Sequence, residues 1–424
     1  MPNNRTRVIS QSKAVYVAPT GWTTTESGTV KRTLEAAQLH GIDTFSFEMD
    51  LAGSRQDVRE FGQLARIGTV RMSEINPTLS LGYYLQDGAN ELALGFTEGS
   101  NQCIHAMLTE DAAKRESNLF VLTATEGEDA FSYTSDSAFD TAKADHDVIG
   151  FGNAFISSYS VNMSVGEIPR ADIEMQASNV VFYRDIHSGI IPPSLDLDGS
   201  RARPEGGSAD AVPNIGLPKP TVCADLAGGL KVLKPHDVTI VFTHTDTSKG
   251  VTSLGGSDIA GIGGQVIGAT ASEIKAIQSC SIDLPLSREV IDAVGSKLAY
   301  AKPLDFPIDV TLNISALVTE FGQGALEKAL TGTAGDNSVD IVITLKSNPA
   351  TSQMVFTLKK AVLDSQSFSQ GLDDNETVDL TFSAQIGGAT TTNQGLFFTT
   401  LNGSDPRPTA ATKNVVNQAG QPIS

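Results

Sequence analysis

Two stretches of this chain carry the same pattern of residues. Residues 55–82 and 288–315 align without a gap, each residue of the second lying 233 positions after its partner. The identical pairs include Arg55 with Arg288, Gly62 with Gly295, Ile75 with Ile308, Thr78 with Thr311, and Leu79 with Leu312. A second ungapped pair joins residues 154–177 to residues 361–384, in the same order along the chain. Low identity with matched apolar positions is expected when selection preserves a core, so the pattern predicts two copies of one module.

The length of the chain agrees with a duplicated unit. A chain of 424 residues exceeds one ordinary domain and suits two modules with connecting segments. We place the first module, with an N-terminal arm, in residues 1–182 and the second module in residues 236–395. Residues 183–235 are rich in Pro, Gly and Ser and are predicted to be a linker, and residues 396–424 are predicted to be an extended tail.

Both copies show the alternation typical of half-buried strands. In residues 45–51 and 280–286 apolar and polar residues alternate, and Phe45 and Phe47 fall on Cys280 and Ile282 once two extra residues of the first copy, Ala52 and Gly53, are allowed for. Further strands are predicted at residues 75–84, 119–125 and 168–182, at their counterparts 308–317, 340–346 and 377–386, and at residues 238–244, whose counterpart is residues 14–17. Abundant Gly and Pro with few charged residues favour the same interpretation. The sequence therefore predicts a mainly β fold of two tandem antiparallel β-barrel or sandwich modules with extended loops and arms.

Each module is also predicted to hold one short packed helix. Ser54 is a candidate N-cap, Val58 and Phe61 would share a face, and Gly62 could end the helix. The second copy repeats this arrangement with Ser287, Ile291, Val294 and Gly295.

The first copy is longer than the second. Equivalent residues are 233 positions apart in the first matched block and 207 positions apart in the second. The first copy therefore carries 26 more residues between positions 82 and 154. That region is acidic and turn-rich, as in residues 126–129 and 136–147, and predicts surface loops. In the strand predicted at residues 75–84, Pro77 suggests an edge strand or the first residues of a strand.

Charge and cysteine usage restrict the partners and the compartment. The net charge is −19, and the basic residues form no cluster, which argues against phosphate binding driven by counterion release. Cys103, Cys223 and Cys280 are widely spaced and odd in number, as expected for free thiols in a reducing compartment. The first 14 residues lack an apolar signal core and no window reaches the length of a membrane span, so we expect synthesis to end in a cytoplasm.

One local motif has the spacing of a metal site. Residues 194–199, followed by Glu205, match the positions of a calcium-binding loop. However, Ser194 stands where Asp is usual, Pro192 and Pro193 prevent an entering helix, and Pro204 directly precedes the glutamate. A chance match in an acidic linker is the favoured interpretation, and we predict no metal.

No arrangement of residues points to catalysis. The histidines are scattered over positions 40, 105, 146, 187, 236 and 244, without a pair at metal-ligand spacing on one predicted element. Ser272 and Lys275 have the spacing of a Ser-x-x-Lys nucleophile but precede a strand, and the glycines of residues 255–268 lack the order of a phosphate-binding loop. We predict no catalytic residue and no cofactor, and hence a protein that is not an enzyme.

Arg55 and Arg288 occupy the same position of the repeat. A cation in the first turn of a helix opposes the helix dipole, so its retention in two diverged copies calls for an explanation. One interpretation is that each pairs with a carboxylate of a neighbouring subunit. The other is that both are remnants of the duplication, and the sequence leaves the two open.

Two segments resemble a known family. Residues 277–311, with Ser287, Arg288 and Gly295 followed by residues 306–311 (FPIDVT), resemble the core of bacteriophage tail tube (major tail) proteins. Residues 160–171, with the sequence GEIP at 166–169, resemble the closing hairpin of that family. The resemblance covers both copies but neither the linker nor the last 29 residues. It implies antiparallel β-barrels or sandwiches, each with one packed helix, whose sheets join around a ring.

The resemblance also implies a function. If the ring of the family holds six units, three of these two-module chains would fill it, and stacked rings would form a tube for genome delivery in the virion tail, made and assembled in the host cytoplasm. The implied partners are further copies of the chain and the tape measure, tail terminator and distal tail or baseplate proteins, with no membrane. DNA would pass through the lumen without specific binding, because an acidic or neutral lining repels phosphate over a Debye length of about 8 to 10 Å.

Two other functions are alternatives. A baseplate hub, also built from two fused tube modules, would form a single trimer per virion. An acidic β-rich adhesin or carbohydrate-binding module is the second alternative, and the lack of a secretion signal and the single tryptophan, Trp22, argue against it.

Overall fold

The structure is a computed structural model, and it confirms the mainly β fold. It describes residues 13–19, 33–50, 55–72, 76–109, 116–124, 129–130, 146–183, 190, 192–195, 214–217, 233, 238–243, 264–266, 271–274, 277–295, 299, 301–317, 338–348, 351–369 and 376–400. The first copy contains β1 (Lys13–Pro19), β2 (Thr33–Glu35), β3 (Ala37–Leu39), β4 (Ile42–Glu48), β5 (Arg55–Val58), β6 (Gly68–Arg71), β7 (Thr78–Tyr84), α1 (Ala89–Ala93), α2 (His105–Leu108), β8 (Ser117–Thr123), β9 (Asp147–Ser164), β10 (Arg170–Gln176) and β11 (Asn179–Tyr183), followed by β12 (Asn214–Gly216). The second copy contains β13 (Val238–Thr243), β14 (Gly264–Val266), β15 (Ala271–Ile274), β16 (Ile277–Pro285), β17 (Asp309–Leu317), β18 (Val339–Asn348), β19 (Thr351–Ser369), β20 (Thr377–Gln385) and β21 (Gly395–Thr400).

The strand pairings of the first copy recur in the second. In the first copy the antiparallel pairs are β3–β1, β1–β8, β8–β9, β9–β11, β9–β10, β10–β7 and β7–β4. In the second copy the corresponding pairs are β15–β13, β13–β18, β18–β19, β19–β21, β19–β20, β20–β17 and β17–β16. The sequence repeat is therefore a repeat of topology.

The registers of the pairings coincide as well. Phe45 faces Leu81 in the first copy, and the aligned residues Cys280 and Ile314 face each other in the second. The register shift in β4, between Ile42 and Thr44, recurs at the equivalent position of β16, between Ile277 and Ser279. The shift in β9, opposite Glu174 and Met175 of β10, recurs in β19 between Leu363 and Ser365. Because a slip of one residue would turn the apolar side chains of a strand to the wrong face, a shared core preserves register even when identity is lost.

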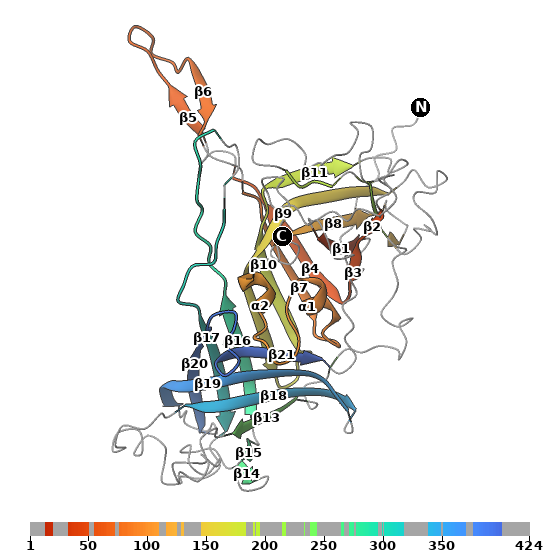
Figure 1. Cartoon of the computed structure of the whole chain (residues 1–424), viewed down its shortest axis with the longest axis vertical. Coiled ribbons are helices and arrows are strands. Elements are labelled where there is room, and N and C mark those ends of the chain that lie inside the picture. The colour runs from red at the N-terminus through yellow and green to blue at the C-terminus, as the bar shows by residue number, and fades with distance from the viewer. Residues whose placement is uncertain are drawn as a thin grey trace.

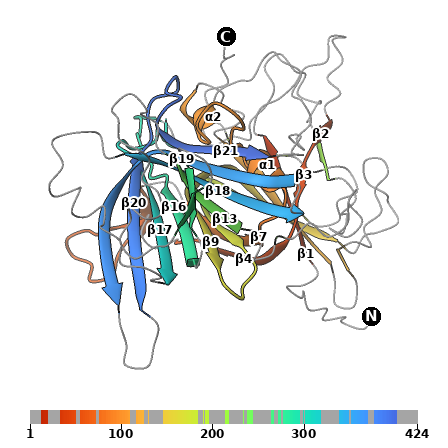
Figure 2. The ribbon, with the colours of Figure 1, turned by 90° about the horizontal axis from the view of Figure 1, so that it is seen from below.

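One long strand in each copy passes from one sheet into another. The first half of β9 pairs with β8 and β11, and its second half pairs with β10. β19 does the same between β18 and β20, and Figure 2 shows β18, β19 and β21 lying across the direction of β16 and β17. At each corner lies a non-glycine residue with positive φ, Asn153 (51°) and Lys360 (55°), which are equivalent in the repeat. Such irregular residues re-aim a strand and make corners between sheets.

The two copies share one continuous sheet. The second half of β9 pairs with β16, so an eight-stranded sheet runs in the order β4, β7, β10, β9, β16, β17, β20 and β19. All of these ladders are antiparallel, so β4 and β16 run in the same direction. The segments that follow β4 and β16 therefore leave the sheet at the same end, as Figure 1 shows.

These two segments are equivalent hairpin arms, and the predicted helices are wrong. In the first arm (residues 55–72), Arg55 faces Arg71 across the β5–β6 ladder; in the second arm (residues 288–304), Arg288 faces Leu304. Gly62 and Gly295 have positive φ values of 98° and 92° and lie in the turns, which is why glycine is kept there. A helix of about eight residues needs tertiary packing of its apolar face, and Phe61 and Val294 are instead fully exposed. The only two helices in the described ranges, α1 and α2, both belong to the first copy.

The segment between β7 and β8 contributes to the core. α1 and α2 lie between β7 and β8, and Leu92, Phe96 and Ile104 in this segment are buried in the main core. That core is one apolar cluster that extends across both copies. The loops predicted at residues 126–129 and 136–147 lie almost entirely outside the described residues, so that prediction is not tested.

Residues outside the two matched blocks complete the fold. Ile190 and Leu217, from the predicted linker, belong to a second cluster that also includes Tyr16 and Phe120. The predicted strand 168–182 is divided into β10 and β11, and Pro77 directly precedes β7, an interior strand, as suggested by the second interpretation of that proline. The predicted tail begins with β21, which pairs with β19.

The two corner residues provide a test of the fold. The side chain of Asn153 accepts a hydrogen bond from the Leu195 N–H (2.8 Å) and donates one to Glu116 Oε2 (3.0 Å). We expect Asn153→Ala to lower the free energy of unfolding by about 2 to 3 kcal/mol, because it loses both bonds and the tolerance of asparagine for positive φ. Lys360→Asn should be neutral or slightly stabilising. Urea unfolding of both variants measures this, and an undiminished stability of Asn153→Ala would contradict it.

Candidate assembly site

The seam between the copies is a strand ladder. Val161 of β9 faces Ile282 of β16, and both are buried in the core; Ser160 faces Asp283 on the opposite side of the sheet. Two more backbone bonds extend the seam, from Val165 N–H to Gln278 O and from Leu286 N–H to Ser157 O (both 2.9 Å). A strand edge carries a row of unpaired backbone groups, so each copy satisfies one edge of the other.

The segment around α2 forms a second contact between the copies. Cys103 N–H donates to Leu396 O (2.8 Å), and Gly99 N–H donates to Phe398 O (3.0 Å), so this segment lies against β21. The side-chain amide of Gln102 donates to Gly387 O (2.7 Å) and Gly388 O (2.6 Å). Residues of the first copy that lie between β7 and β8 thus attach it to the second copy.

The base of the second arm forms a third contact, and it contains Arg288. The guanidinium lies 4.8 Å from the centroid of the Phe155 ring and donates to Lys302 O (3.0 Å) and Ile156 O (3.4 Å). Lys302 is itself buried and donates to Asn76 Oδ1 (3.0 Å) and Ser178 Oγ (3.2 Å) of the first copy. A cation above an aromatic face is stabilised by the negative charge of the ring face.

Arg55 has a different environment from Arg288. It is exposed on β5, at the base of the first arm, and the structure does not bring the two arginines into one site. The role of Arg55 in a contact between subunits stays a prediction. The sequence repeat could not identify Phe155 and Lys302 as contacts of Arg288. The residue aligned with Phe155 in the other copy is Val362, and the residue aligned with Lys302 is Thr69, so neither contact is repeated.

One face of the eight-stranded sheet is polar and acidic. The apolar side chains of its strands, such as Leu81, Ile173 and Leu312, point into the core, while the alternate residues point away from it. In these described strands, the charged residues on the outer face include Asp43, Glu48, Asp172, Glu174, Asp283, Asp309, Asp379 and one cation, Arg170. Arg170 donates to Asp172 (2.7 Å) and to Asp43 (3.2 Å), and the bond to Asp172 raises its pKa. Carboxylates therefore dominate the electrostatic potential of this face.

Each outer strand of this sheet has a ladder on one side only among the described residues. β4 has a ladder with β7 only, and the second half of β19 has a ladder with β20 only. β4 corresponds to β16, and β19 corresponds to β9. The two free edges are therefore the counterparts of the two edges that meet in the internal seam.

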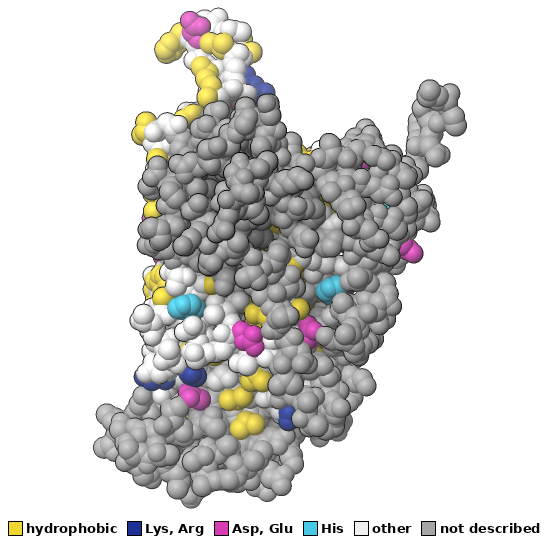
Figure 3. Space-filling model, turned by 45° about the vertical axis from the view of Figure 1, so that its right-hand side comes forward, with side chains coloured by type: hydrophobic (Ala, Val, Ile, Leu, Met, Phe, Trp, Pro, Cys, Tyr) yellow, Lys and Arg dark blue, Asp and Glu magenta, His cyan; other side chains and the backbone are white. Residues whose placement is uncertain are grey.

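Both arms present apolar side chains to the surface. Exposed side chains of the first arm are Val58, Phe61, Leu64, Ile67, Val70 and Met72, and those of the second arm include Val290, Ile291 and Val294. Figure 3 shows the first arm, with its apolar side chains, projecting beyond the rest of the molecule. An exposed apolar patch of this kind marks an interaction site.

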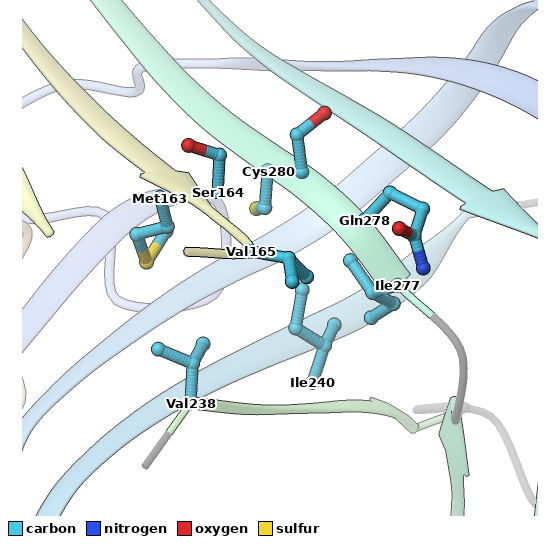
Figure 4. A pocket seen from close by; sticks show the side chains of 9 residues that line it. Met163, Ser164, Val165, Val238, Ile240, Ile277, Gln278 and Cys280 are labelled. Carbon is cyan, nitrogen blue, oxygen red and sulfur yellow. The ribbon is translucent and has the colours of Figure 1, made fainter. Parts of the chain in front are cut away.

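A small cavity lies at the end of the seam. Its volume is about 60 Å³, and Met163, Val165, Ile240, Ile277 and Cys280 are among the side chains around it, as Figure 4 shows. Ligand pockets have volumes of roughly 300 to 1,000 Å³, so this cavity is too small for a substrate or cofactor.

A buried carboxylate in α1 holds the first copy together. Glu91 Oε1 accepts hydrogen bonds from the hydroxyls of Tyr83 (2.8 Å) on β7 and Tyr159 (3.2 Å) on β9. Burial raises the pKa of Glu91 from 4.5 to about 7, and the two tyrosine bonds oppose that shift only in part. The sequence did not reveal this group, because Tyr159 lies 68 positions away and Tyr83 belongs to a separate strand.

The other predicted sites lie largely outside the described residues. Of the calcium-like loop only Ser194 and Leu195 are described, and they lie against Asn153 and Gly152 of β9. Lys275, Cys223, His187, His236 and His244 are outside the described ranges, as is most of the glycine-rich segment 255–268. Within the described ranges, no three His, Cys, Asp or Glu side chains gather as a metal site would require.

The two described cysteines are buried and unpaired. Burial raises the pKa of both Cys103 and Cys280 to about 12, so neither thiol forms the reactive thiolate at neutral pH. None of the helices in the described segments is both long and apolar enough to cross a membrane.

Comparison with known proteins assigns no family to this chain. No protein-family model matches the chain, and no curated protein matches its sequence.

The pKa of Glu91 predicts a pH-dependent stability. Between pH 4.5 and about 7 the unfolded chain releases this proton while the folded chain keeps it, so rising pH destabilises the fold across this window. A shift of this size corresponds to about 3 kcal/mol. We expect Glu91→Gln to gain thermal stability relative to the unaltered chain as the pH rises from 5 to 8. Glu174→Gln, at an exposed position, is the control and should show no such gain; a Glu91→Gln difference that does not change with pH would refute the assignment.

Proposed function

We propose that this chain is a structural virion protein that forms a phage tail tube, as stacked rings around a channel for genome delivery. The observation that carries the proposal is the duplicated module with its free edges. Each chain contains one seam between copies and retains both edge types of that seam at its ends. The resemblance of both copies to tail tube proteins supplies the family context.

The free edges favour a closed ring. An interface between two different edges is heterologous, so chains joined in this way form a ring if the rotation closes. Six modules would come from three chains, with three seams inside chains and three between them. The ring would then have pseudo-sixfold symmetry.

The acidic face supports the role of a DNA channel. We propose that this face lines the lumen, where carboxylates such as Glu174, Asp309 and Asp379 would keep the phosphate backbone from adhering. DNA would then pass without specific binding. Nothing in this role requires catalysis, a metal or a cofactor.

The arms support stacking of rings. Both arms leave the same end of the sheet and carry exposed apolar residues, and contact with the next ring would cover them. Because such a contact is also heterologous, it propagates as a filament. The tape measure, tail terminator and distal tail or baseplate proteins are the further partners in this proposal, with the virion tail as the location and the host cytoplasm as the place of assembly.

Electron microscopy of the purified chain tests the proposal. We expect negative-stain images to show long tubes with a central channel and end-on views with sixfold character. Single rings that do not stack would instead support the baseplate hub, which shares the two-module design. Monomers without rings under all assembly conditions would refute both.

The charge of the lining provides a second test. We expect the triple variant Glu174→Lys, Asp309→Lys, Asp379→Lys to assemble normally but to retain linear double-stranded DNA at low salt, with retention lost as salt rises. The matched triple variant with Gln, Asn and Asn at these positions should not retain DNA, because it only neutralises the charge. Equal retention by the two variants, measured by co-sedimentation, would show that these residues do not face the DNA.

A further inference from the structure

The internal seam defines how two chains meet. We infer that β4 of one chain pairs with the second half of β19 of a second copy in the register of the internal seam, and that Arg55 then covers Val362 of that copy. The inference rests on the ring assembly proposed above, but it requires neither a channel nor stacked rings.

Equivalent residues differ in exposure between the seam and the outer edges. Val161, inside the seam, is 0% exposed, whereas its counterpart Phe368 on the outer strand is 44% exposed. On the other edge, Leu284 is 1% exposed and its counterpart Met49 is 37% exposed. Large apolar side chains thus stand at the free edges where the internal seam buries their equivalents, and burying them would stabilise an interface of the same form.

The register of the pairing follows from the repeat. In the internal seam Ser281 faces Asn162, Ile282 faces Val161, and Asp283 faces Ser160. The equivalent pairs between chains are Ser46 with Ser369, Phe47 with Phe368, and Glu48 with Ser367. All six of these residues lie in described strands, and the bulges beside them coincide in the two copies, so no shift is needed to superimpose the edges.

The arm base completes the match. Arg288 covers Phe155, which is 4% exposed, and the counterpart of Phe155 is Val362, which is 45% exposed. The counterpart of Arg288 is Arg55, which holds the same position at the base of its arm, with two extra residues, Ala52 and Gly53, between it and β4. If the base of the first arm lies on the neighbouring chain as the second arm lies on the first copy, pairing of the edges brings the guanidinium of Arg55 to Val362 and to the carbonyl oxygen of Leu363, the counterpart of Ile156. A carbonyl oxygen and an apolar surface, rather than a carboxylate, are the partners expected for Arg55.

Engineered cysteine pairs test the register. We expect Ser46→Cys with Ser369→Cys, in the full-length chain under mild oxidation, to shift the monomer band to dimers and trimers on a non-reducing gel. Ser46→Cys with Ser367→Cys should remain monomeric, because its Cα atoms would be about 7 to 8 Å apart, beyond the reach of a disulfide. The internal pair Asn162→Cys with Ser281→Cys is the matched control and should form its disulfide within one chain. The unaltered chain and the single variants report any linkage through the native cysteines.

The outcomes separate this inference from the tube function. Rings or tubes without the Ser46–Ser369 link, or with a Ser46–Ser367 link, would overturn the register and leave the function standing. Linked trimers that never form tubes would support the inference and refute the tube. A chain that neither links nor assembles would overturn both.

A double-mutant cycle tests the Arg55 contact. We expect Arg55→Ala to make the assembly dissociate at a higher protein concentration while the unfolding temperature of the dissociated chain stays unchanged. Arg288→Ala should lower that unfolding temperature, because its contacts lie within the chain. Val362→Phe, which restores the ring found at Phe155, should strengthen the assembly with Arg55 present and have no effect in the Arg55→Ala background. Equal effects of Val362→Phe in both backgrounds would remove Arg55 from this position.

Discussion

Edge pairing between β9 and β16 is the interaction on which the rest of this structure depends. A sheet of one module ends in two rows of unpaired N–H and C=O groups, which must be paired, covered or left in water. Joining two modules in one chain pairs one edge of each and buries Val161 and Ile282. Among the described residues, the outer strands β4 and the second half of β19 each have a ladder on one side only.

The corners at Asn153 and Lys360 make this arrangement possible. Each allows a single long strand to serve two sheets, so the eight-stranded sheet and the sheets behind it enclose one core. Glu91 strengthens that core in the first copy by linking β7 and β9 through their tyrosines. The apolar side of the shared sheet is thus fully occupied, and the acidic side is left for solvent or for a neighbour.

The strands were largely predictable from the sequence and the arms were not. Alternation located β4, β7, β16, β17 and β20 to within a few residues, because one buried face leaves a period-two signal. The long strands β9 and β19 were not predicted in full, since the corner interrupts the alternation. The helices expected at Arg55 and Arg288 were wrong because a cap, a shared face and a glycine also suit a hairpin. Only the absence of a surface to pack against decides between the two.

What the sequence determined by itself was the duplication, the strand positions and the excess of negative charge. Each of these depends on residue order or composition and needs no knowledge of distant contacts. The tertiary structure alone decided which edges meet, that Arg288 lies over Phe155 while Arg55 stays exposed, and that the segment around Gln102 attaches to the second copy. These features join residues more than 110 positions apart, and local pattern carries no information about such pairs.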